Sequence, residues 1–371
     1  MKKPVYLLHS SVISSLGTHV VEHIDALKNK QSGLIISDDP CLHDEALPFG
    51  KVAEKIFEKH KELSRFDALI KETLLHLLKE SKINLSTNDV GILFSTTKGN
   101  IELLEKNDIN EKIYFSYSAE LIKTTLKNEN DPIIVSNACI SGMSIFILAE
   151  RLLQEGKYKH MVLVGCDVLT KFVVSGFNSF HALDKNSCKP FDKNRLGINL
   201  GEACAACVLS IEHHSPIQIL KGFISNDANH ISGPSKTGEE LAFCIKQSLL
   251  QNQVEPHEID FIAAHGTGTV YNDQMEAKAI SINHLSNTPT MSYKAYIGHT
   301  LGAAGILEII LSAHCMKEQF IPASLNYQEA DNENALAIQQ DTEYKKIKYV
   351  LKTAAGFGGC NAALILKNTD L

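Results

Sequence analysis

The sequence lacks three features that define other classes of protein. No apolar stretch approaches the roughly 20 residues needed to cross a bilayer. Basic residues are not in excess, since 36 Lys and Arg stand against 43 Asp and Glu. Apart from one Cys-x-x-Cys pair, cysteine and histidine do not occur at the paired spacings of a zinc site. From the first and third of these absences we expect no membrane span and no bound metal. From the second, and from the net charge of −7, we expect no nucleic-acid partner.

The nine cysteines form an odd count in a long chain, which favours reduced thiols and a cytoplasmic location. The start of the chain imitates a signal peptide, but His9 and several serines interrupt its apolar part, so we expect a first strand there. One Cys-x-x-Cys pair, Cys204 and Cys207, lies in a run of small apolar residues. We interpret this pair as packing within a buried strand.

Strand and helix patterns follow one order twice along the 371 residues. This predicts an α/β fold with two similar halves, residues 1–214 and 215–371, on mostly parallel sheets. In the first half we expect strands near 5–11, 90–95, 132–136, 160–164 and 203–211, with helices near 20–28, 66–80, 119–127 and after Cys139. In the second half we expect strands near 217–224, 259–264, 290–292, 349–354 and 362–366, with helices near 237–251, 273–282 and after Gly302.

Two predicted helices, near 143–153 and 303–316, are apolar on nearly every face, which is typical of helices in a protein interior. Glu308 lies inside the second of them. A buried carboxylate needs a partner. Lys294 is the predicted partner of Glu308, with a solvent-facing Glu308 as the alternative.

Cys139 stands at the start of the first apolar helix, just after a strand that ends at Val135. Free backbone N–H groups and the positive end of the helix dipole favour a thiolate there. Small neighbours such as Ala138 and Gly142 leave room for a carbonyl group. Cys139 is therefore a candidate nucleophile, with a buried structural cysteine as the alternative.

Three further segments carry candidate site residues. His265 follows a predicted strand and precedes Gly266-Thr267-Gly268-Thr269, where glycine lets the backbone approach a ligand. His299 takes, in the second half, the place that Cys139 takes in the first, so a two-fold arrangement would bring both helix starts together. The glycine-rich turn at 353–361 is expected to offer a backbone N–H to a thioester oxygen rather than to hold phosphate.

Taken together, these four segments resemble the elongating β-ketoacyl-acyl carrier protein synthases, condensing enzymes of the thiolase superfamily. The resemblance covers nearly the whole chain, including the stretches 189–195 and 201–202. It implies a thiolase-like fold in which two β-α-β-α-β halves form a five-layered α-β-α-β-α sandwich.

The resemblance implies that Cys139 takes an acyl group from a phosphopantetheine thiol, and that His265 and His299 polarise a malonyl thioester and stabilise its enolate. The backbone N–H groups of Cys139 and Phe357 would form the oxyanion hole, and Lys294 and Glu308 would support the histidines. The other residues implied to contact the substrate are Thr267, Thr269, Ala355, Gly356 and Gly358, with the Phe357 ring as a gate. The phosphopantetheine arm belongs to the substrate, and no other cofactor is implied.

An acyl carrier protein is the implied partner, together with a second copy or a related synthase-like subunit in a dimer. Because carrier proteins are acidic, the predicted docking residues are Arg65, Lys193 and Arg195. Ala355 stands where many relatives have Phe, and the segment 34–65 is shorter than in typical members. The acyl chain and the pathway, fatty acid or polyketide, therefore stay open.

Two alternatives compete with an active synthase. A non-catalytic chain-length-factor-like subunit has the same fold but usually lacks the nucleophile, and an acyl-CoA thiolase would carry a second reactive cysteine near the last strand. The presence of Cys139, His265 and His299 together favours the active synthase. Cys360, which lies near the last strand, is interpreted as packing.

Overall fold

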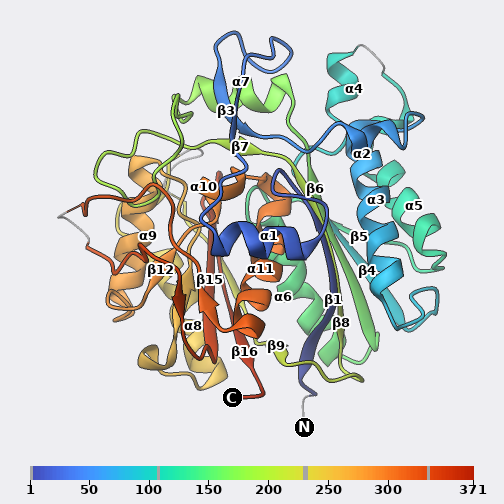
Figure 1. Cartoon of the computed structure of the whole chain (residues 1–371). Coiled ribbons are helices and arrows are strands. Elements are labelled where there is room, and N and C mark those ends of the chain that lie inside the picture. The colour runs from blue at the N-terminus through green and yellow to red at the C-terminus, as the bar shows by residue number, and fades with distance from the viewer. Residues whose placement is uncertain (1–2, 107–108, 229–232, 332–334) are drawn as a thin grey trace.

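The computed structural model describes residues 3–106, 109–228, 233–331 and 335–371. In this part of the chain, one large mixed sheet runs through the molecule (Figure 1). Its first five strands are β1 (Val5–Ile13), β4 (Val90–Ser95), β5 (Ile133–Val135), β6 (His160–Asp167) and β8 (Ala203–Ser210). The others are β9 (Ile217–Ile219), β10 (Phe223–Asn226), β11 (Phe261–Ala263), β12 (Thr290–Met291), β15 (Tyr349–Gly356) and β16 (Cys360–Asn368).

The strand order shows the duplication directly. The sheet runs β12-β11-β15-β16-β9-β1-β8-β6-β4-β5, with β10 also paired to β16. Read outward from the centre, the first copy is β1-β8-β6-β4-β5 and the second is β9-β16-β15-β11-β12, which is the same order of corresponding strands. The two copies meet where β1 pairs with β9 in antiparallel orientation. The predicted boundary at 214 and 215 falls between β8 and β9.

The prediction of mostly parallel sheets is wrong, because each copy is mixed. β4 is parallel to β5 and β6, and β11 is parallel to β12 and β15. The last strand of each copy, β8 or β16, is antiparallel to both of its main neighbours. β15 and β16 are joined by a short turn, and hairpin neighbours are antiparallel by geometry. The predicted strand at 217–224 is also divided, into β9 and β10.

Two helices lie between the halves of the sheet. α6 (Ser141–Gln154) and α11 (Ala304–Glu318) pack against each other and share one hydrophobic core with strands of both copies. Glycine makes this close approach possible, since a methyl group at Gly142 would lie 2.7 Å from the backbone nitrogen of Ile306. At Gly305 it would lie 2.4 Å from the backbone nitrogen of Met143. Both predicted interior helices are confirmed.

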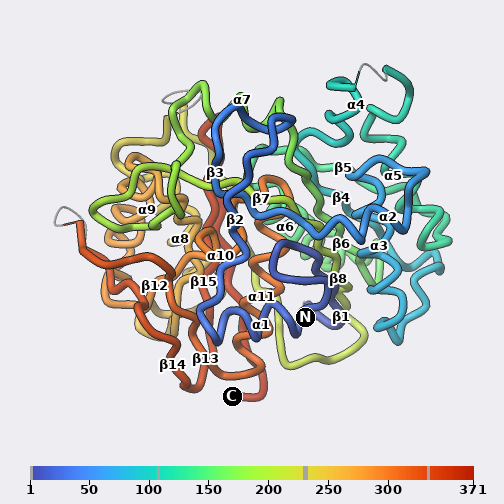
Figure 2. Tube along the Cα trace, turned by 45° about the horizontal axis from the view of Figure 1, so that its top comes forward, coloured from blue at the N-terminus to red at the C-terminus, as the bar shows by residue number. Residues whose placement is uncertain are grey.

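Other helices cover the outer faces of the sheet. α3 (Arg65–Glu80) and α5 (Phe115–Leu126) pack together on the first copy, and α8 (Glu239–Asn252) and α9 (Val270–Ile282) pack together on the second (Figure 1). α1 (Val20–Lys28) packs on α11 and crosses in front of it in Figure 2. The result is a layered α-β-α-β-α arrangement. No helix in the described ranges is both long and apolar enough to cross a bilayer.

Shorter elements gather above one end of the two central helices. α7 (Lys171–Ser179), β3 (Leu47–Gly50) and β7 (Leu200–Gly201) share a small hydrophobic cluster there. None of these three elements is predicted from the sequence. The remaining elements are β2 (Ile35–Ser37), α2 (Lys55–Glu58), α4 (Glu102–Glu105), η1 (Glu111–Ile113), η2 (Pro256–Glu258), α10 (Lys294–Ile297), η3 (Leu301–Ala303), β13 (Phe320–Ile321) and β14 (Glu343–Tyr344).

The Cys-x-x-Cys pair illustrates how strand geometry separates neighbouring cysteines. Cys204 and Cys207 are both fully buried on β8, but they pack in different hydrophobic clusters. Residues three apart on a strand point to opposite faces of the sheet. The packing interpretation is confirmed for both residues.

Candidate active site

Cys139 lies in a tight turn between β5 and α6. Ala138 adopts a left-handed backbone conformation with φ of 43°. The Ser141 hydroxyl donates to the carbonyl of Ala138 at 2.6 Å and accepts from the N–H of Asn137 at 2.8 Å. These local bonds hold Cys139 at the start of α6, where it is 8% exposed and lines a cavity.

The thiol of Cys139 is not ionised at neutral pH in this environment. Burial raises its pKa to about 12. A helix terminus stabilises a charge by about 1 kcal/mol, which is less than the ~1.4 kcal/mol of one pKa unit. Burial therefore opposes the stabilisation of a thiolate that is expected at a helix start, and desolvation outweighs the helix dipole. The proton of Cys139 has to leave during the reaction.

His265 is fixed by hydrogen bonds from its own backbone N–H and from that of the next residue. It follows β11, and its N–H and that of Gly266 both donate to the Glu276 carboxylate on α9 at 2.8 Å. Gly266 has a φ of +41°, and a methyl group there would lie 2.7 Å from Cβ of Ser292. Burial and nearby positive charge lower the pKa of the His265 imidazole well below its usual value.

His299 follows α10 and the left-handed Gly298, whose φ is +80°. Its backbone N–H donates to the carbonyl of Asn199, and its carbonyl accepts from the N–H of Gly201. Within the described part of the chain, neither ring nitrogen of His299 has a hydrogen-bond partner, although both are buried. Burial and the charge of Lys294 lower the pKa of its imidazole well below the usual value.

One cavity of ≈ 360 Å³ brings Cys139, His265 and His299 together. The two imidazole rings are 5.2 Å apart between centroids and nearly perpendicular, at 86°. The predicted meeting of the first-half cysteine with the second-half histidines is confirmed. The cavity is also lined by Thr267, Thr269, Ala355, Gly356 and Phe357.

The glycine-rich turn after β15 approaches Cys139 closely. A methyl group at Gly356 would lie 3.0 Å from the backbone nitrogen of Cys139 and 2.9 Å from Sγ of Cys360. Gly358, which the sequence analysis also assigns to the substrate, is exposed and is not among the residues that line the cavity. The turn therefore contributes Gly356 and Phe357 rather than all of its glycines.

Behind the histidines lies a buried group of three charges. Glu308 on α11 forms an ion pair with Lys294, as predicted, and a second one with Lys352 on β15 at 2.7 Å. All three side chains are almost fully buried. Burial alone would raise the pKa of Glu308, but the two ammonium groups outweigh it and hold the pKa below its usual value. Lys352 stands one residue before the glycine-rich segment and is not among the residues predicted from the sequence.

α7 and Phe180, the residue that follows it, supply two aromatic rings that were not predicted from the sequence. Phe177 and Phe180 line the cavity, with their ring centroids 5.4 Å and 5.3 Å from that of Phe357. Two features of the sequence could have revealed this helix. The Thr170 hydroxyl caps it by accepting from the N–H of Val173, and Val173, Val174 and Phe177 have helical spacing.

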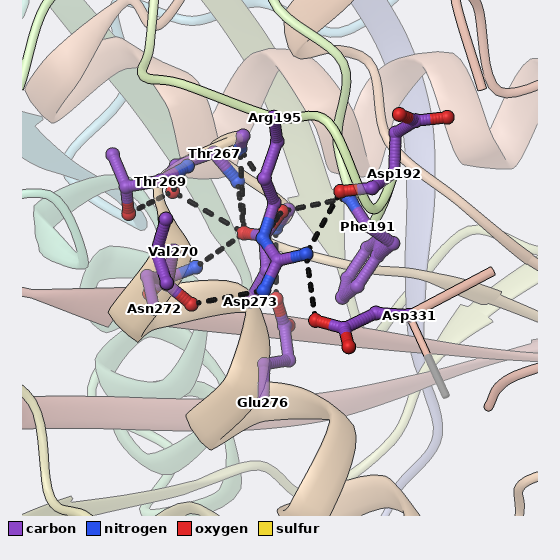
Figure 3. Close-up of polar contacts among 12 residues, drawn as sticks. Phe191, Asp192, Arg195, Thr267, Thr269, Val270, Asn272, Asp273, Glu276 and Asp331 are labelled. Carbon is purple, nitrogen blue, oxygen red and sulfur yellow. Dashed lines mark hydrogen bonds and ion pairs between the residues drawn. The ribbon is translucent and has the colours of Figure 1, made fainter. Parts of the chain in front are cut away.

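The structure contradicts the prediction that Arg195 docks a partner, because this residue is only 4% exposed. Its guanidinium donates to Asp331 at 3.0 Å and to the carbonyls of Asp192 and Val270 (Figure 3). Asp273, beside it, accepts the N–H groups of Thr267 and Gly268. Arg195 therefore stabilises the loop that carries the threonines from within.

The other two predicted docking residues differ in accessibility. Arg65 begins α3 and is partly buried, with ion pairs to Glu54 and to the fully buried Glu202. Lys193 is about half exposed and pairs with Glu329. Of the three, Lys193 is the most accessible to a partner. In the described residues, no group of three or more His, Cys, Asp or Glu side chains could hold a metal ion.

Comparison with known proteins gives independent evidence of the family to which the chain belongs. Residues 22–214 match the family described as beta-ketoacyl synthase, N-terminal domain, and residues 218–328 match its C-terminal domain. The chain is 31% identical over 264 residues to a 3-oxoacyl-[acyl-carrier-protein] synthase 2 of Coxiella burnetii. This match covers 66% of the chain and 63% of that relative.

Solved structures share the whole fold. A ketosynthase in complex with its chain length factor from Xenorhabdus doucetiae superposes with a TM-score of 0.89 at 24% identity, covering 99% of this chain and 98% of that one. A ketosynthase bound to a hexaketide, solved in complex with a type II polyketide acyl-carrier protein, superposes with a TM-score of 0.88 at 20% identity, covering 100% of both chains. These likenesses confirm the predicted thiolase-like α/β fold.

Proposed function

Because the chain belongs to the β-ketoacyl synthase family, we propose that it joins an acyl chain to a malonyl group with loss of carbon dioxide. Both groups would arrive as thioesters on the phosphopantetheine arm of an acyl carrier protein. The observation that carries this proposal is the single cavity shared by one thiol and two buried, uncharged imidazoles.

In the first half-reaction, Sγ of Cys139 attacks the acyl carbonyl carbon. The new C–S bond replaces the bond to the phosphopantetheine sulfur, and the proton of the Cys139 thiol passes to that leaving sulfur. The backbone N–H groups of Cys139 and Phe357 would bind the carbonyl oxygen as negative charge develops on it. The closeness of Gly356 to the Cys139 backbone supports this role.

In the second half-reaction, the malonyl thioester loses carbon dioxide and becomes an enolate. Its carbon attacks the acyl group on Cys139, the acyl C–S bond breaks, and the Cys139 sulfur takes up one proton from the solvent to restore the thiol. Neutral His265 and His299 can each donate an N–H to the developing oxyanion. The absence of any partner for the His299 ring nitrogens among the described residues supports this use.

We further propose that the protein works with an acyl carrier protein and as a dimer with a second copy or a related synthase-like subunit. β5 ends the sheet with three half-buried residues, Ile133, Ile134 and Val135. An edge strand with such side chains is suited to pairing with another chain. Nine free cysteines support a reducing location such as the cytoplasm.

Intact-mass spectrometry tests the function. The protein is incubated with a panel of acyl-carrier proteins, and we expect a mass increase equal to one acyl group. Cys139→Ala should abolish the adduct, whereas Cys360→Ala, which removes the neighbouring thiol, should keep it. An adduct that persists in Cys139→Ala would refute the assignment. No adduct on the wild-type protein would favour the non-catalytic subunit.

A further inference from the structure

Lys352 is a buried cation surrounded by oxygen atoms. It is the fourth residue of β15 and has no exposed surface. Its Nζ lies 2.7 Å from Glu308 and donates to the carbonyls of Ala263, Ala264 and Thr353 at 3.1, 3.3 and 2.6 Å. An ammonium group has only three protons. All of them therefore have acceptors close by.

These acceptors connect Lys352 to both histidines. The carbonyls of Ala263 and Ala264 immediately precede His265, whose own N–H is bound by Glu276. Through Glu308, Lys352 is linked to Lys294, which stands five residues before His299. We propose that Lys352 is a positioning residue, which orients the His265 segment and maintains positive charge behind both imidazoles.

The sum of charges explains why a second lysine matters. Lys294 and Glu308 alone would be neutral, whereas Lys294, Lys352 and Glu308 together carry a formal charge of +1. A positive charge in a dry interior disfavours an imidazolium and favours an anion nearby. The enolate of the proposed reaction is such an anion. This inference therefore deepens the proposed function and rests on it for its catalytic consequence.

The other titratable groups near the imidazoles come from different elements. They include Lys294 on α10, Glu308 on α11, Glu276 on α9, Asp167 at the end of β6 and the uncharged Cys139 thiol before α6. His181 and Asp227 line the same cavity. Burial raises the pKa of Glu276 and of Asp167. Both lysines lower the pKa of His265 and of His299. Loss of the Lys352 charge should therefore raise the pKa of both imidazoles.

Titration of the histidine ring signals by NMR tests this charge effect without substrate. Lys352→Gln keeps an N–H donor and removes the charge, and we expect the pKa of His265 and His299 to rise by about one unit or more. Adding Glu308→Gln restores the formal charge of +1 and should lower both values again. Lys367→Gln, on neighbouring β16 and only partly buried, is the matched control. Unchanged values in Lys352→Gln would overturn the proposal.

Kinetics separate positioning from general structural damage. In Lys352→Gln, acylation of Cys139 should change by less than about 3-fold, whereas carbon dioxide release should fall by about 10-fold to 100-fold. The acid limb of the rate profile should move to higher pH. Lys352→Met removes the N–H donor as well, and its rate of carbon dioxide release should be lower still. Equal losses in both half-reactions with an unmoved acid limb would refute the role of Lys352, whereas a wild-type protein that takes no acyl group would refute the proposed function instead.

Discussion

The two copies of the repeated fold have the same strand order but carry different chemistry where they meet. In the first copy, Thr96 follows β4, Cys139 follows β5 and Asp167 is the last residue of β6. In the second copy, His265 follows β11, His299 follows β12 and α10, and Lys352 lies within β15. The first copy therefore supplies a thiol, and the second supplies two imidazoles backed by buried charges.

Asp167 shows that a buried charge in the first copy is managed differently. Its carboxylate has no ion pair among the described residues, and instead accepts from the hydroxyl and N–H of Thr97, the hydroxyl of Thr96 and the N–H of Gly302. In the second copy Glu308 has two ammonium partners. Both sites lie at corresponding positions of the two copies, and the asymmetry of buried charge divides the proposed chemistry between them.

The strongest test of this division is to remove side chains from each copy. Cys139→Ala should abolish acylation but leave the release of carbon dioxide from a malonyl carrier protein. His265→Ala and His299→Ala should lower that release by about 10²-fold to 10⁴-fold and affect acylation far less. Both rates can be measured by mass spectrometry and by a carbon dioxide assay. If each variant lost both activities to the same extent, the copies would not have separate roles.

Acid should destabilise both copies through histidines whose pKa is lowered by burial, and outside the candidate active site each copy has one with a pKa of about 4. Burial lowers the pKa of His23 on α1 and of His314 on α11 to about 4, against 6.5 when exposed. As the pH falls below 6.5, the unfolded chain binds protons that the folded chain does not, so stability falls until the pH reaches about 4. The loss is up to about 3 kcal/mol for each histidine.

Urea unfolding between pH 7 and pH 4 measures this effect. His314→Gln should make the free energy of unfolding less dependent on pH by about one proton, or ~1.4 kcal/mol per pH unit at most. The exposed His257→Gln is the matched control. An equally steep curve in His314→Gln would show that this imidazole is not the source.

The smallest expected effect concerns the contact between the copies. Gly142→Ala and Gly305→Ala place a methyl group against the backbone of the opposite helix, and each should lower the free energy of unfolding by about 1–3 kcal/mol. Gly176→Ala, on α7 with open space around it, should be neutral or stabilising by up to about 1 kcal/mol. If the two losses in free energy of unfolding, for Gly142→Ala and for Gly305→Ala, differed by more than about 1 kcal/mol, the contact would not be symmetric.

Several elements could be predicted from the sequence with little error. α1 and β4 have the predicted bounds, and both apolar helices lie in the interior as expected. Cys139, His265 and His299 were identified because each stands where a buried strand or helix meets small residues. The glycines beside them permit conformations and close approaches that are visible from residue type alone.

Other features could not be read from local patterns. Arg195 resembles a surface cation in the sequence, but the structure encloses it with Asp331 and Asp273. α7 is short and carries polar residues, so its sequence gives a weak helical signal. It covers the cavity because it packs with β3 and β7, which are distant along the chain.

The sequence by itself determined the order of the elements and their repetition and indicated the three residues of the proposed reaction, because side-chain periodicity and glycine act over a few residues. Only the tertiary structure decided the protonation of Cys139, the burial of Arg195 and the pairing of Lys352 with Glu308. These properties depend on how much water is excluded and on which distant groups replace it, and both are set by packing between segments far apart in the chain.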